Sequence, residues 1–415
     1  MPKVSVVIPS YNHGRYLERR FESILAQTFT DYEIVFLDDA STDESLKVFE
    51  KYRDHPKVRT FLNATNSGSV LKQWNKGVRE ARGEYVWFAE SDDASLPRFL
   101  QTMVQRLDAH PNVGLAYANS VYIDENDFVG GEMDPWTRPT HPERWQQDFV
   151  NSGLDECRHY LVLRNSIPNA SAVVFRRALY EQVGGADEDM QLCGDWATWV
   201  KLLLASDVAY VAEPLNLDRV PHAHSVRTQT FRRPVHLVEY LRIVGRILAH
   251  GPLPPAIARQ TLDITAGGWL HQIDHADGIT DPAVHRASLQ AAHELGVAYW
   301  HGLLASVMIR VAQSSNALKP LEQRMAAVEY GWGFLQGREQ EATRALGWLV
   351  QQEGVLRERL DQAEAAVGAL SARFDEQAES MRFWNRLRRM ILPPNSWRHR
   401  ILRGFLRLVR RRPAA

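Results

Sequence analysis

The sequence predicts an α/β protein with a mainly parallel sheet and helices on both faces of that sheet. Short apolar runs of strand length alternate with helical patterns four times within the first hundred residues. Polar or acidic residues follow directly after three of these four runs. Because ligands bind outside the carboxyl ends of the strands in open α/β sheets, these residues are expected to line one crevice.

The four expected strands cover residues 4–8, 32–37, 58–62 and 85–89. The first leads into Pro-Ser-Tyr-Asn and then into apolar residues at helical spacing from Arg15 to Gln27. The second ends in Asp38-Asp39, and the third is followed by a helical pattern that runs to Ala81. This order of elements is typical of successive strand–helix units.

The fourth strand ends abruptly in the acidic turn Glu90-Ser91-Asp92-Asp93. Three carboxylates at the end of a buried strand are costly unless a cation meets them. Alternate residues of an extended chain point to the same side, so Glu90 and Asp92 can share a face. Oxygen ligands of this kind suit Mg²⁺ or Mn²⁺ held together with substrate phosphates. A capped, solvated loop is the alternative that these residues alone leave open.

The next hundred residues predict further strands at 113–117, 171–176 and 208–212. Residues 126–153 have no clear period and predict a long loop over the acceptor side. Its aromatic residues either stack on an acceptor or hold the loop on the core; they are Trp136, Trp145 and Phe149. Asp195 lies in the first turn of a predicted helix, where an acidic residue also stabilises the helix by itself.

Four segments in the first hundred residues resemble the motifs of a known family. The segments SVVIPSYN, ILAQTFTDYEIVFLDDASTD, NSGS and ARGEYVWFAESDD are similar to successive motifs of family 2 glycosyltransferases, which have the GT-A fold. The resemblance covers about the first 100 residues strongly. It continues more loosely over 165–226 through IPNASAVVFRR, GDW and RVPHAHSV.

The resemblance implies a role for particular residues. Pro9, Tyr11 and Asp39 match positions that hold the nucleotide base and ribose. An ordinary turn after a strand also explains Tyr11. Asp38 either shares the role of Asp39 or supports that residue. The acidic turn matches the Asp-x-Asp motif with Glu90 in its first place, which implies Asp92 as the leading metal ligand.

The implied metal site also includes Asp93 and, with a longer side chain than the motif's aspartate, Glu90. Asp195 matches the catalytic base of inverting members. Arg219 and His222 match residues that neutralise the diphosphate; this match needs a shift of one residue, so His224 is an alternative.

Composition narrows the classes of function. The net charge of −1 predicts no general affinity for nucleic acid, and the two cysteines give no zinc pattern. No G-x-G-x-x-G follows the first strand, and neither a P-loop motif nor H-E-x-x-H occurs. The early first strand leaves no room for a signal peptide, and no apolar run has the length of a membrane span. We therefore expect a cytoplasmic protein with reduced, buried cysteines.

The expected domains are a catalytic domain over 1–230, with a nucleotide-sugar half (1–105) and an acceptor half (106–230), and a helical extension over 231–350. A 4-3-4-3 apolar spacing predicts a coiled coil over 351–384, and with it a possible homo-oligomer. A long helix packed on its own domain is the alternative.

The segment 385–415 predicts a basic amphipathic tail that lies on an anionic membrane surface at the inner face of the membrane. Together with residues 382–384 it holds eleven arginines and no Asp or Glu, so that the rest of the chain carries −12. Trp397, Phe405 and the neighbouring aliphatic residues fall on one half of a helix, opposite most of the arginines. Docking of this helix on the acidic body of the protein is the alternative.

The resemblance, together with the acidic turn, implies an inverting glycosyltransferase. It would move a sugar from a nucleotide diphosphate sugar to a hydroxyl of a glycan or lipid-linked acceptor, assisted by Mg²⁺ or Mn²⁺. Two other classes of protein are also compatible with the sequence. A nucleotidyltransferase would share the nucleotide site and the metal, and a non-catalytic membrane-associated assembly protein would use the C-terminal helices.

Overall fold

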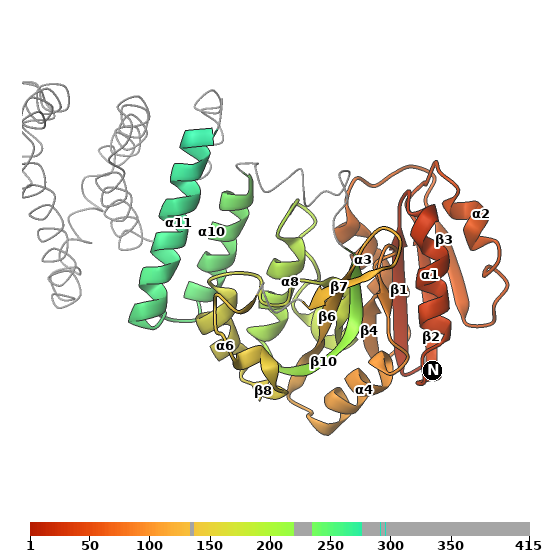
Figure 1. The fold of residues 1–415 in the computed structure, drawn as a ribbon, viewed down its shortest axis with the longest axis horizontal. Helices are drawn as coiled ribbons and strands as arrows, with labels where there is room; N and C mark the ends of the chain where they lie inside the picture. Colours follow the sequence, from red (N-terminus) through yellow and green to blue (C-terminus); the bar gives the residue numbers. More distant parts are fainter. Residues whose placement is uncertain (133–136, 220–234, 276–290, 292–294, 296–415) are drawn as a thin grey trace, which may run out of the picture. The chain divides into compact units, whose positions relative to one another are not determined.

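In the part of the chain that the structure describes, a mixed sheet of ten strands is flanked by helices (Figure 1). The computed structural model describes residues 1–132, 137–219, 235–275, 291 and 295. The chain divides into two units, and all described residues belong to the first, Met1–Arg310 with Ala317–Gly333.

The first half of the sheet is parallel. It contains, in spatial order, β3 (Val58–Leu62), β2 (Tyr32–Asp38), β1 (Val4–Ser10) and β4 (Tyr85–Phe88). These are the four strands expected from the apolar runs. Their carboxyl ends meet at one edge because neighbouring parallel strands run in the same direction.

The second half of the sheet is largely antiparallel. It continues with β9 (Val173–Arg176), β6 (Val113–Ile123), β10 (Asp207–Arg219) and β5 (Ala94–Ser95), while β7 (Val129–Glu132) pairs with β6 and β8 (Phe149–Asn151) pairs with β10. Only β6 and β10 are parallel to each other here. β9 runs antiparallel to both β4 and β6. The expectation of a mainly parallel sheet is therefore right for the first half and wrong for the second.

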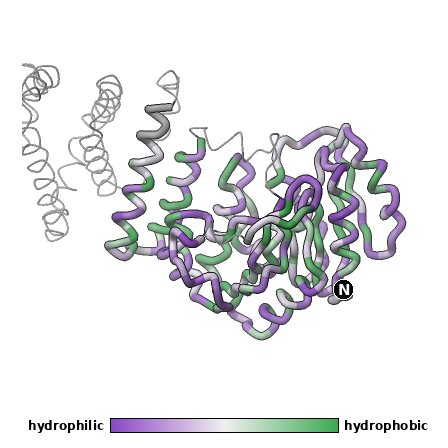
Figure 2. The backbone as a smooth tube through the Cα atoms, in the orientation of Figure 1, coloured by the Kyte–Doolittle hydropathy of each residue, from purple (hydrophilic) through white to green (hydrophobic). Residues whose placement is uncertain are grey.

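Helices cover both faces of the sheet. On one face lie α1 (Gly14–Leu25), α2 (Ser45–Phe49) and α4 (Phe99–Ala109). On the other lie α3 (Val70–Glu80), α7 (Arg177–Gln182) and α8 (Gly194–Leu203), joined to the sheet by the ring contacts of Phe88 with Trp74 and Tyr180. The strands between them are mainly hydrophobic, whereas the helices carry both kinds of residue (Figure 2).

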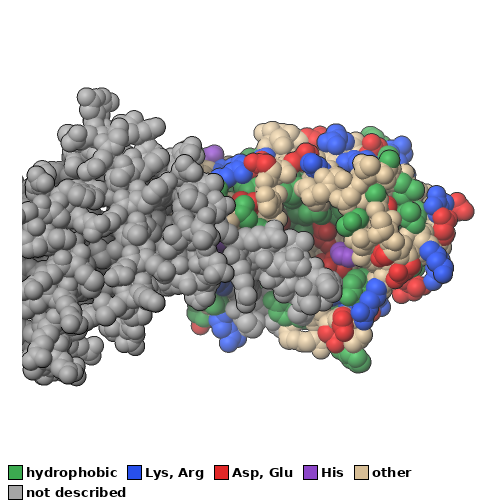
Figure 3. Space-filling view, turned by 90° about the horizontal axis from the view of Figure 1, so that it is seen from above, with side chains coloured by type: hydrophobic (Ala, Val, Ile, Leu, Met, Phe, Trp, Pro, Cys, Tyr) green, Lys and Arg blue, Asp and Glu red, His purple; other side chains and the backbone are tan. Residues whose placement is uncertain are grey.

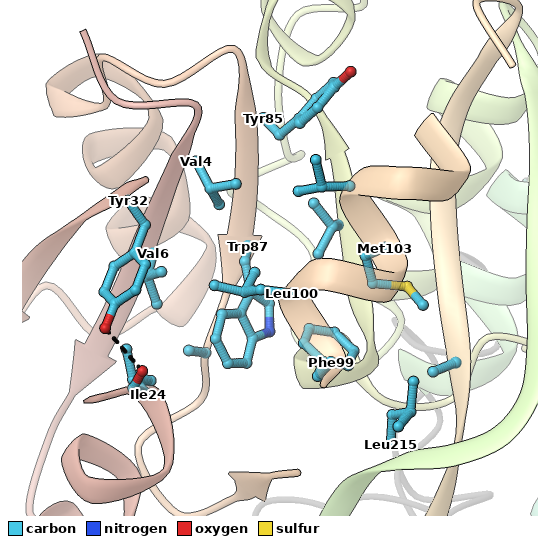
Figure 4. Packing of buried hydrophobic residues seen from close by; sticks show 14 of the residues in the cluster. Val4, Val6, Ile24, Tyr32, Tyr85, Trp87, Phe99, Leu100, Met103 and Leu215 are labelled. Atoms are coloured by element: carbon cyan, nitrogen blue, oxygen red, sulfur yellow. Dashed lines mark hydrogen bonds between the residues drawn. The ribbon is translucent and has the colours of Figure 1, made fainter. Parts of the chain in front are cut away.

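The core follows from the alternation of side chains along the strands. Val4 and Val6 of β1 and Trp87 of β4 face α1 and α4, where they meet Ile24 and Phe99 (Figure 4). Val7 of β1 points to the opposite face of the sheet and faces α3. Gly77 of α3 lies so close that a Cβ atom added to it would stand 2.3 Å from Val7 Cγ1. Glycine at position 77 thus lets α3 approach the sheet.

The segment expected to be a long loop contains short regular elements. β7, β8 and a 3₁₀ turn, Arg144–Gln146, lie within residues 126–153. The buried Trp145 donates a hydrogen bond from Nε1 to the Tyr117 hydroxyl at 2.8 Å, and the ring of Phe149 lies 5.0 Å from that of Tyr210. These two aromatic residues therefore hold the segment on the core, and Trp136 lies outside the described residues.

Helix α6 (Gly153–Glu156), followed by a π-helical turn over Cys157–Leu161, leads back to the sheet. α10 begins at Val235 and ends at Leu248, and α11 begins at Pro255 and ends at His275. Cys157 and Cys193 are buried and free. None of the helices in the described ranges is long and apolar enough to span a bilayer. Nearly all of the remaining helical pattern, the coiled coil and the basic tail lie outside the described residues.

Candidate active site

The carboxyl ends of β1, β2 and β4 form the floor of the candidate site. Figure 3 looks onto this edge and shows a hollow with acidic side chains and a histidine on its floor. The acidic turn Glu90–Asp93 follows β4 directly. Hydrogen bonds hold this turn to α1, to α3, to the segment before β9 and to the end of β10.

Arg20 of α1 is the first anchor of the acidic turn. Its side chain is completely buried, and its Nε donates to the carbonyl oxygen of Glu90 at 2.7 Å. Its Nη2 donates to Ser171 Oγ at 3.0 Å and lies 3.9 Å from Asp93 Oδ2. Burial lowers the pKa of Arg20 to about 10, although the carboxylates of the turn oppose this shift. Arg20 therefore supplies one buried positive charge to these acids, and the predicted divalent cation stays a prediction.

Both carboxylate oxygens of Asp93 accept hydrogen bonds from within the protein. Its Oδ1 accepts a hydrogen bond from the Arg219 backbone at 2.8 Å. Its Oδ2 accepts from Ser171 Oγ at 2.6 Å and from Asn169 Nδ2 at 3.3 Å. Burial raises the pKa of Asp93, and the nearby negative charge of Asp92 raises it further. These contacts join the acidic turn to the segment before β9 and to the end of β10.

Glu90 lies half-buried between α3 and Asp92. Its Oε1 accepts a hydrogen bond from Trp74 Nε1 at 2.8 Å. Burial, reinforced by the charge of Asp92, raises the pKa of Glu90 to about 8. Trp74 therefore fixes the longer side chain that replaces the aspartate of the motif.

Asp92 differs from its neighbours because its carboxylate has no hydrogen bond to any described residue. The side chain is half-buried. Its backbone carbonyl accepts a hydrogen bond from Arg219 Nε at 2.6 Å, which holds the residue in place. Ser91, the residue before it, bonds through Oγ to His13 Nδ1 at 2.8 Å. The structure thus presents one open carboxylate on a tightly held turn.

Arg219 is the last residue of β10, and its side chain is 1% exposed. Its Nη atoms donate to the Asp124 carbonyl and the Asp127 carboxylate in the turn between β6 and β7. Its guanidinium also lies over the ring of Tyr16, 4.3 Å from the ring centroid. The predicted contact of Arg219 with a diphosphate stays a prediction, and His222 and His224 lie outside the described residues.

The nucleotide side of the edge is organised by Asp39. Its Oδ1 accepts hydrogen bonds from Asn63 Nδ2 at 2.6 Å and Gln73 Nε2 at 2.9 Å. Its Oδ2 accepts from Ser67 Oγ at 2.7 Å. Asp39 therefore holds the loop between β3 and α3 against the end of β2.

Three buried polar atoms next to Asp39 have no hydrogen-bond partner among the described residues. They are Ser10 Oγ, Asp38 Oδ2 and Gln73 Oε1. Ser10 and Asp38 are register partners at the ends of β1 and β2, and Gln73 bonds directly to Asp39. Buried polar atoms without partners are costly, so this cluster fits a ligand that donates hydrogen bonds.

The predicted residues of the first loop lie beside this cluster. Pro9 is buried in β1, and Tyr11 is 44% exposed at the loop. Asn12 has a φ of 55°, and its Oδ1 accepts a hydrogen bond from the Thr42 backbone at 2.7 Å. Ala40, with a φ of 63°, is in a conformation that residues with a Cβ atom seldom adopt. Such backbone conformations are typical of ligand-binding loops.

Asp195 is the second residue of α8, as expected from the sequence. Its Oδ2 accepts a hydrogen bond from Asn165 Nδ2 at 2.9 Å, and its Oδ1 accepts from the Trp196 backbone at 2.7 Å. Gly194 lies against α3, where a Cβ atom would stand 2.3 Å from Leu71 Cδ1. The absence of a side chain at Gly194 brings the start of α8 to the carboxyl edge of the sheet.

Several residues that build the site were not predicted, namely His13, Arg20, Trp74 and Ser171. Arg20 carried a signal, because it lies on the apolar face of its helix with Leu17, Phe21 and Ile24. A charged residue on such a face needs a buried partner. The roles of the other three depend on contacts between segments that are distant in sequence.

The acidic turn fits a divalent cation. Burial and the charge of Asp92 raise the pKa values of Glu90 and Asp93, and Arg20 offsets these shifts only in part. The open carboxylate of Asp92 supplies an oxygen ligand. Within the described part of the chain, no group of three His, Cys, Asp or Glu side chains is arranged to hold a metal ion. A site with one or two protein carboxylates is typical of a cation that also binds substrate phosphates.

Replacing Arg20 with methionine is expected to lower the free energy of unfolding by about 3–5 kcal/mol, because it leaves the buried Asp93 without its cation. Chemical denaturation measures this change. Arg19→Met is the matched control, since Arg19 is the neighbouring exposed residue of the same helix and its loss should cost little. Equal stability of the two variants would show that Arg20 does not hold the acidic turn.

The chain is similar in sequence to glycosyltransferases of family 2 and to an uncharacterised bacterial protein. Residues 5–168 match the family model described as "Glycosyl transferase family 2". An uncharacterised protein of Mycobacterium tuberculosis is 31% identical over 246 residues, which is 56% of this chain and 70% of that protein. The poly(ribitol-phosphate) β-N-acetylglucosaminyltransferase TarS of Staphylococcus aureus is 37% identical over 112 residues, or 26% of this chain and 20% of TarS.

Solved structures show the same fold. The crystal structure of S. aureus TarS residues 1–349 in complex with UDP-GlcNAc has a TM-score of 0.55 with this chain at 18% sequence identity. The similarity covers 81% of this chain and 92% of the TarS fragment.

Proposed function

Because the chain belongs to glycosyltransferase family 2, we propose that it is an inverting enzyme that moves a sugar from a nucleotide diphosphate sugar to a hydroxyl of a glycan or lipid-linked acceptor. The observation that carries this proposal is the open carboxylate of Asp92 on the acidic turn. That turn stands at the carboxyl edge of the sheet, where α/β proteins of this kind bind their ligands.

We propose that the nucleotide lies over the ends of β1 and β2. The unpartnered atoms of Ser10, Asp38 and Gln73 support this position, because a base and a ribose both donate hydrogen bonds. Pro9 and Tyr11 border the same place, and Asp39 shapes it by holding the loop before α3. UDP-sugars are the first donors to test, since a TarS fragment of the same fold binds UDP-GlcNAc.

We propose Asp92 as the leading ligand of a divalent cation, Mg²⁺ or Mn²⁺, with Glu90 and Asp93 behind it. When bound, such a cation stabilises the negative charge that develops on the diphosphate leaving group. Glu90 keeps one carboxylate oxygen outside its bond to Trp74, whereas both oxygens of Asp93 are already bonded within the protein. Asp93 therefore acts chiefly by holding the turn that presents Asp92.

We propose Asp195 as the general base. Asn165 and the Trp196 backbone orient its carboxylate at the start of α8. Asp195 takes the proton from the acceptor hydroxyl as the oxygen attacks the anomeric carbon from the side opposite the leaving group. In-line attack of this kind inverts the configuration at that carbon.

A panel of UDP-, GDP- and dTDP-sugars tests the proposed activity. We expect release of the nucleoside diphosphate from one class of donor, dependent on Mn²⁺ or Mg²⁺ and abolished by EDTA. Release of a sugar 1-phosphate instead would indicate transfer of the nucleotide, as in a nucleotidyltransferase. If no donor is consumed or bound in the presence of metal, the proposed activity is wrong.

We also propose that the acceptor is membrane-bound and that the predicted basic tail over 385–415 binds the anionic membrane surface. Each arginine near an anionic surface contributes about 1 kcal/mol of binding, weakened by salt. The full chain should therefore sediment with vesicles that contain phosphatidylglycerol, and a chain ending at residue 381 should not. Equal binding by both chains, or no preference for anionic over neutral vesicles, would count against this role. Comparing the oligomeric state of the full chain with that of a chain ending at residue 350 tests the predicted coiled coil over 351–384 separately.

A further inference from the structure

The turn that leads into α8 is held from outside by a single carboxylate. Glu239 of α10 is 2% exposed and accepts hydrogen bonds from three successive backbone amides. These are the amides of Gln191 at 2.6 Å, Leu192 at 2.9 Å and Cys193 at 2.8 Å. Three successive amides that converge on one anion form a strongly directed contact.

This turn sets where Asp195 lies. Cys193 is the N-cap of α8 and makes no side-chain cap, so the entry into the helix lacks the usual local restraint. Asp195 follows the last Glu239-bound amide by two residues. A shift of the turn would therefore move the proposed base directly.

Other contacts hold the same loop, but they are weaker or farther from Asp195. Arg246 of α10 donates to Asp187 Oδ2 at 2.9 Å, and Asn75 of α3 donates to the Ala186 carbonyl at 3.0 Å. The ion pair of Arg242 with Asp189 is mostly exposed to solvent. Such exposed pairs contribute little to stability. Lys201 of α8 itself also binds Asp187 at 2.9 Å. Among the contacts of this loop, the buried carboxylate of Glu239 is the one that reaches closest in sequence to Asp195.

We propose that Glu239 is a positioning residue for the reaction, which fixes Asp195 through the turn 191–193. This proposal rests on the proposed role of Asp195 as the base. It assigns a role in the active site to α10, a helix outside the segment that matches the family model. A displacement of a reacting group by about 1 Å can cost about 10²-fold in rate, so we expect an effect of that size.

Glu239→Gln tests the proposal, because glutamine keeps the shape but places an NH₂ group against backbone N–H donors. Hydrogen exchange of the amides 191–196 should accelerate, while exchange of β1 and β4 stays unchanged. Turnover of UDP-GlcNAc, or of the donor found in the panel, should fall by about 10²-fold. The affinity for UDP with Mn²⁺ should stay within about twofold. Glu239→Asp, which keeps the carboxylate, should recover part of the turnover.

Glu156→Gln is the matched control. Glu156 is also a fully buried glutamate, and it bonds Arg144 and Asn151 instead of the turn before α8. Its replacement should lower thermal stability without accelerating exchange at 191–196 and without separating turnover from UDP affinity. The same pattern of changes in both variants would mean that Glu239 acts only through global stability, and the proposal would be overturned.

Unchanged exchange at 191–196 in Glu239→Gln, or faster exchange with normal turnover, would also overturn it. Failure of the underlying function has a different signature. In that case Asp195→Asn itself would retain full turnover, whatever happens at Glu239.

Discussion

Asp195→Asn should lower kcat by about 10²–10⁴-fold and leave the affinity for UDP and Mn²⁺ unchanged. General base catalysis contributes rate enhancements of this size, and a base is needed only when the acceptor proton moves. Asparagine has nearly the same shape and can still accept the hydrogen bond from the Trp196 backbone. The variant should therefore fold with α8 in place. Steady-state turnover and UDP titration of the same preparation measure the two quantities.

Asp189→Asn is the control for this substitution. Asp189 is an exposed acid of the loop before α8, and its replacement removes one negative charge without touching the proposed base. Its kcat should match that of the unmodified protein. If Asp195→Asn instead weakens UDP binding in proportion to kcat, Asp195 contacts the donor or supports the fold, and the assignment as base is wrong.

Asp92→Asn should abolish metal-dependent UDP binding and lower turnover by about 10²-fold or more. Lewis acid stabilisation of a leaving group is worth several kcal/mol, and each 1.36 kcal/mol corresponds to a factor of ten. The carboxylate of Asp92 has no hydrogen bond to the described residues, and the turn is held through its backbone carbonyl instead. Thermal stability without metal should therefore stay the same or rise.

Isothermal titration with UDP, with and without Mn²⁺, measures the loss. Asp54→Asn, at an exposed acid away from the carboxyl edge, is the control for a change in net charge. Asp93→Asn provides a second comparison, because Asp93 is bonded within the turn and its replacement should lower stability as well as activity. Full metal-dependent binding by Asp92→Asn would remove Asp92 from the metal site.

The pattern of apolar residues along the sequence was sufficient to predict the strands and two of the helices in the first half of the fold. A strand of four to seven apolar residues followed by a helical period is visible within a short window, so β1 to β4 and helices α1 and α3 could be predicted from their own residues. The acidic turn was equally visible, because carboxylates that directly follow a buried strand stand out in sequence. The helical pattern also placed Asp195 at the start of α8, and the family resemblance added its expected role as the base.

The second half of the sheet could not be predicted in the same way. β9 runs antiparallel between β4 and β6, and its partners lie about 60 to 90 residues away in the chain. β10 extends to Arg219, which therefore ends a strand in the core rather than lying in an open loop. Strand direction and pairing depend on long-range contacts, which the periodicity of one segment does not contain.

The sequence by itself determined that Asp39, Glu90, Asp92, Asp93 and Asp195 stand at the ends of strands or at the start of a helix. It could not separate their roles, because an isolated carboxylate has the same chemistry at every position. Tertiary contacts decided this: Ser171 and Arg219 engage Asp93, Trp74 engages Glu90, and loop amides engage Asp39. Asp92 keeps its carboxylate open, and α10 sets the turn before Asp195 through Glu239. The physical reason is that burial and hydrogen-bond partners, which come from segments far apart in the chain, determine which acids are available to a ligand.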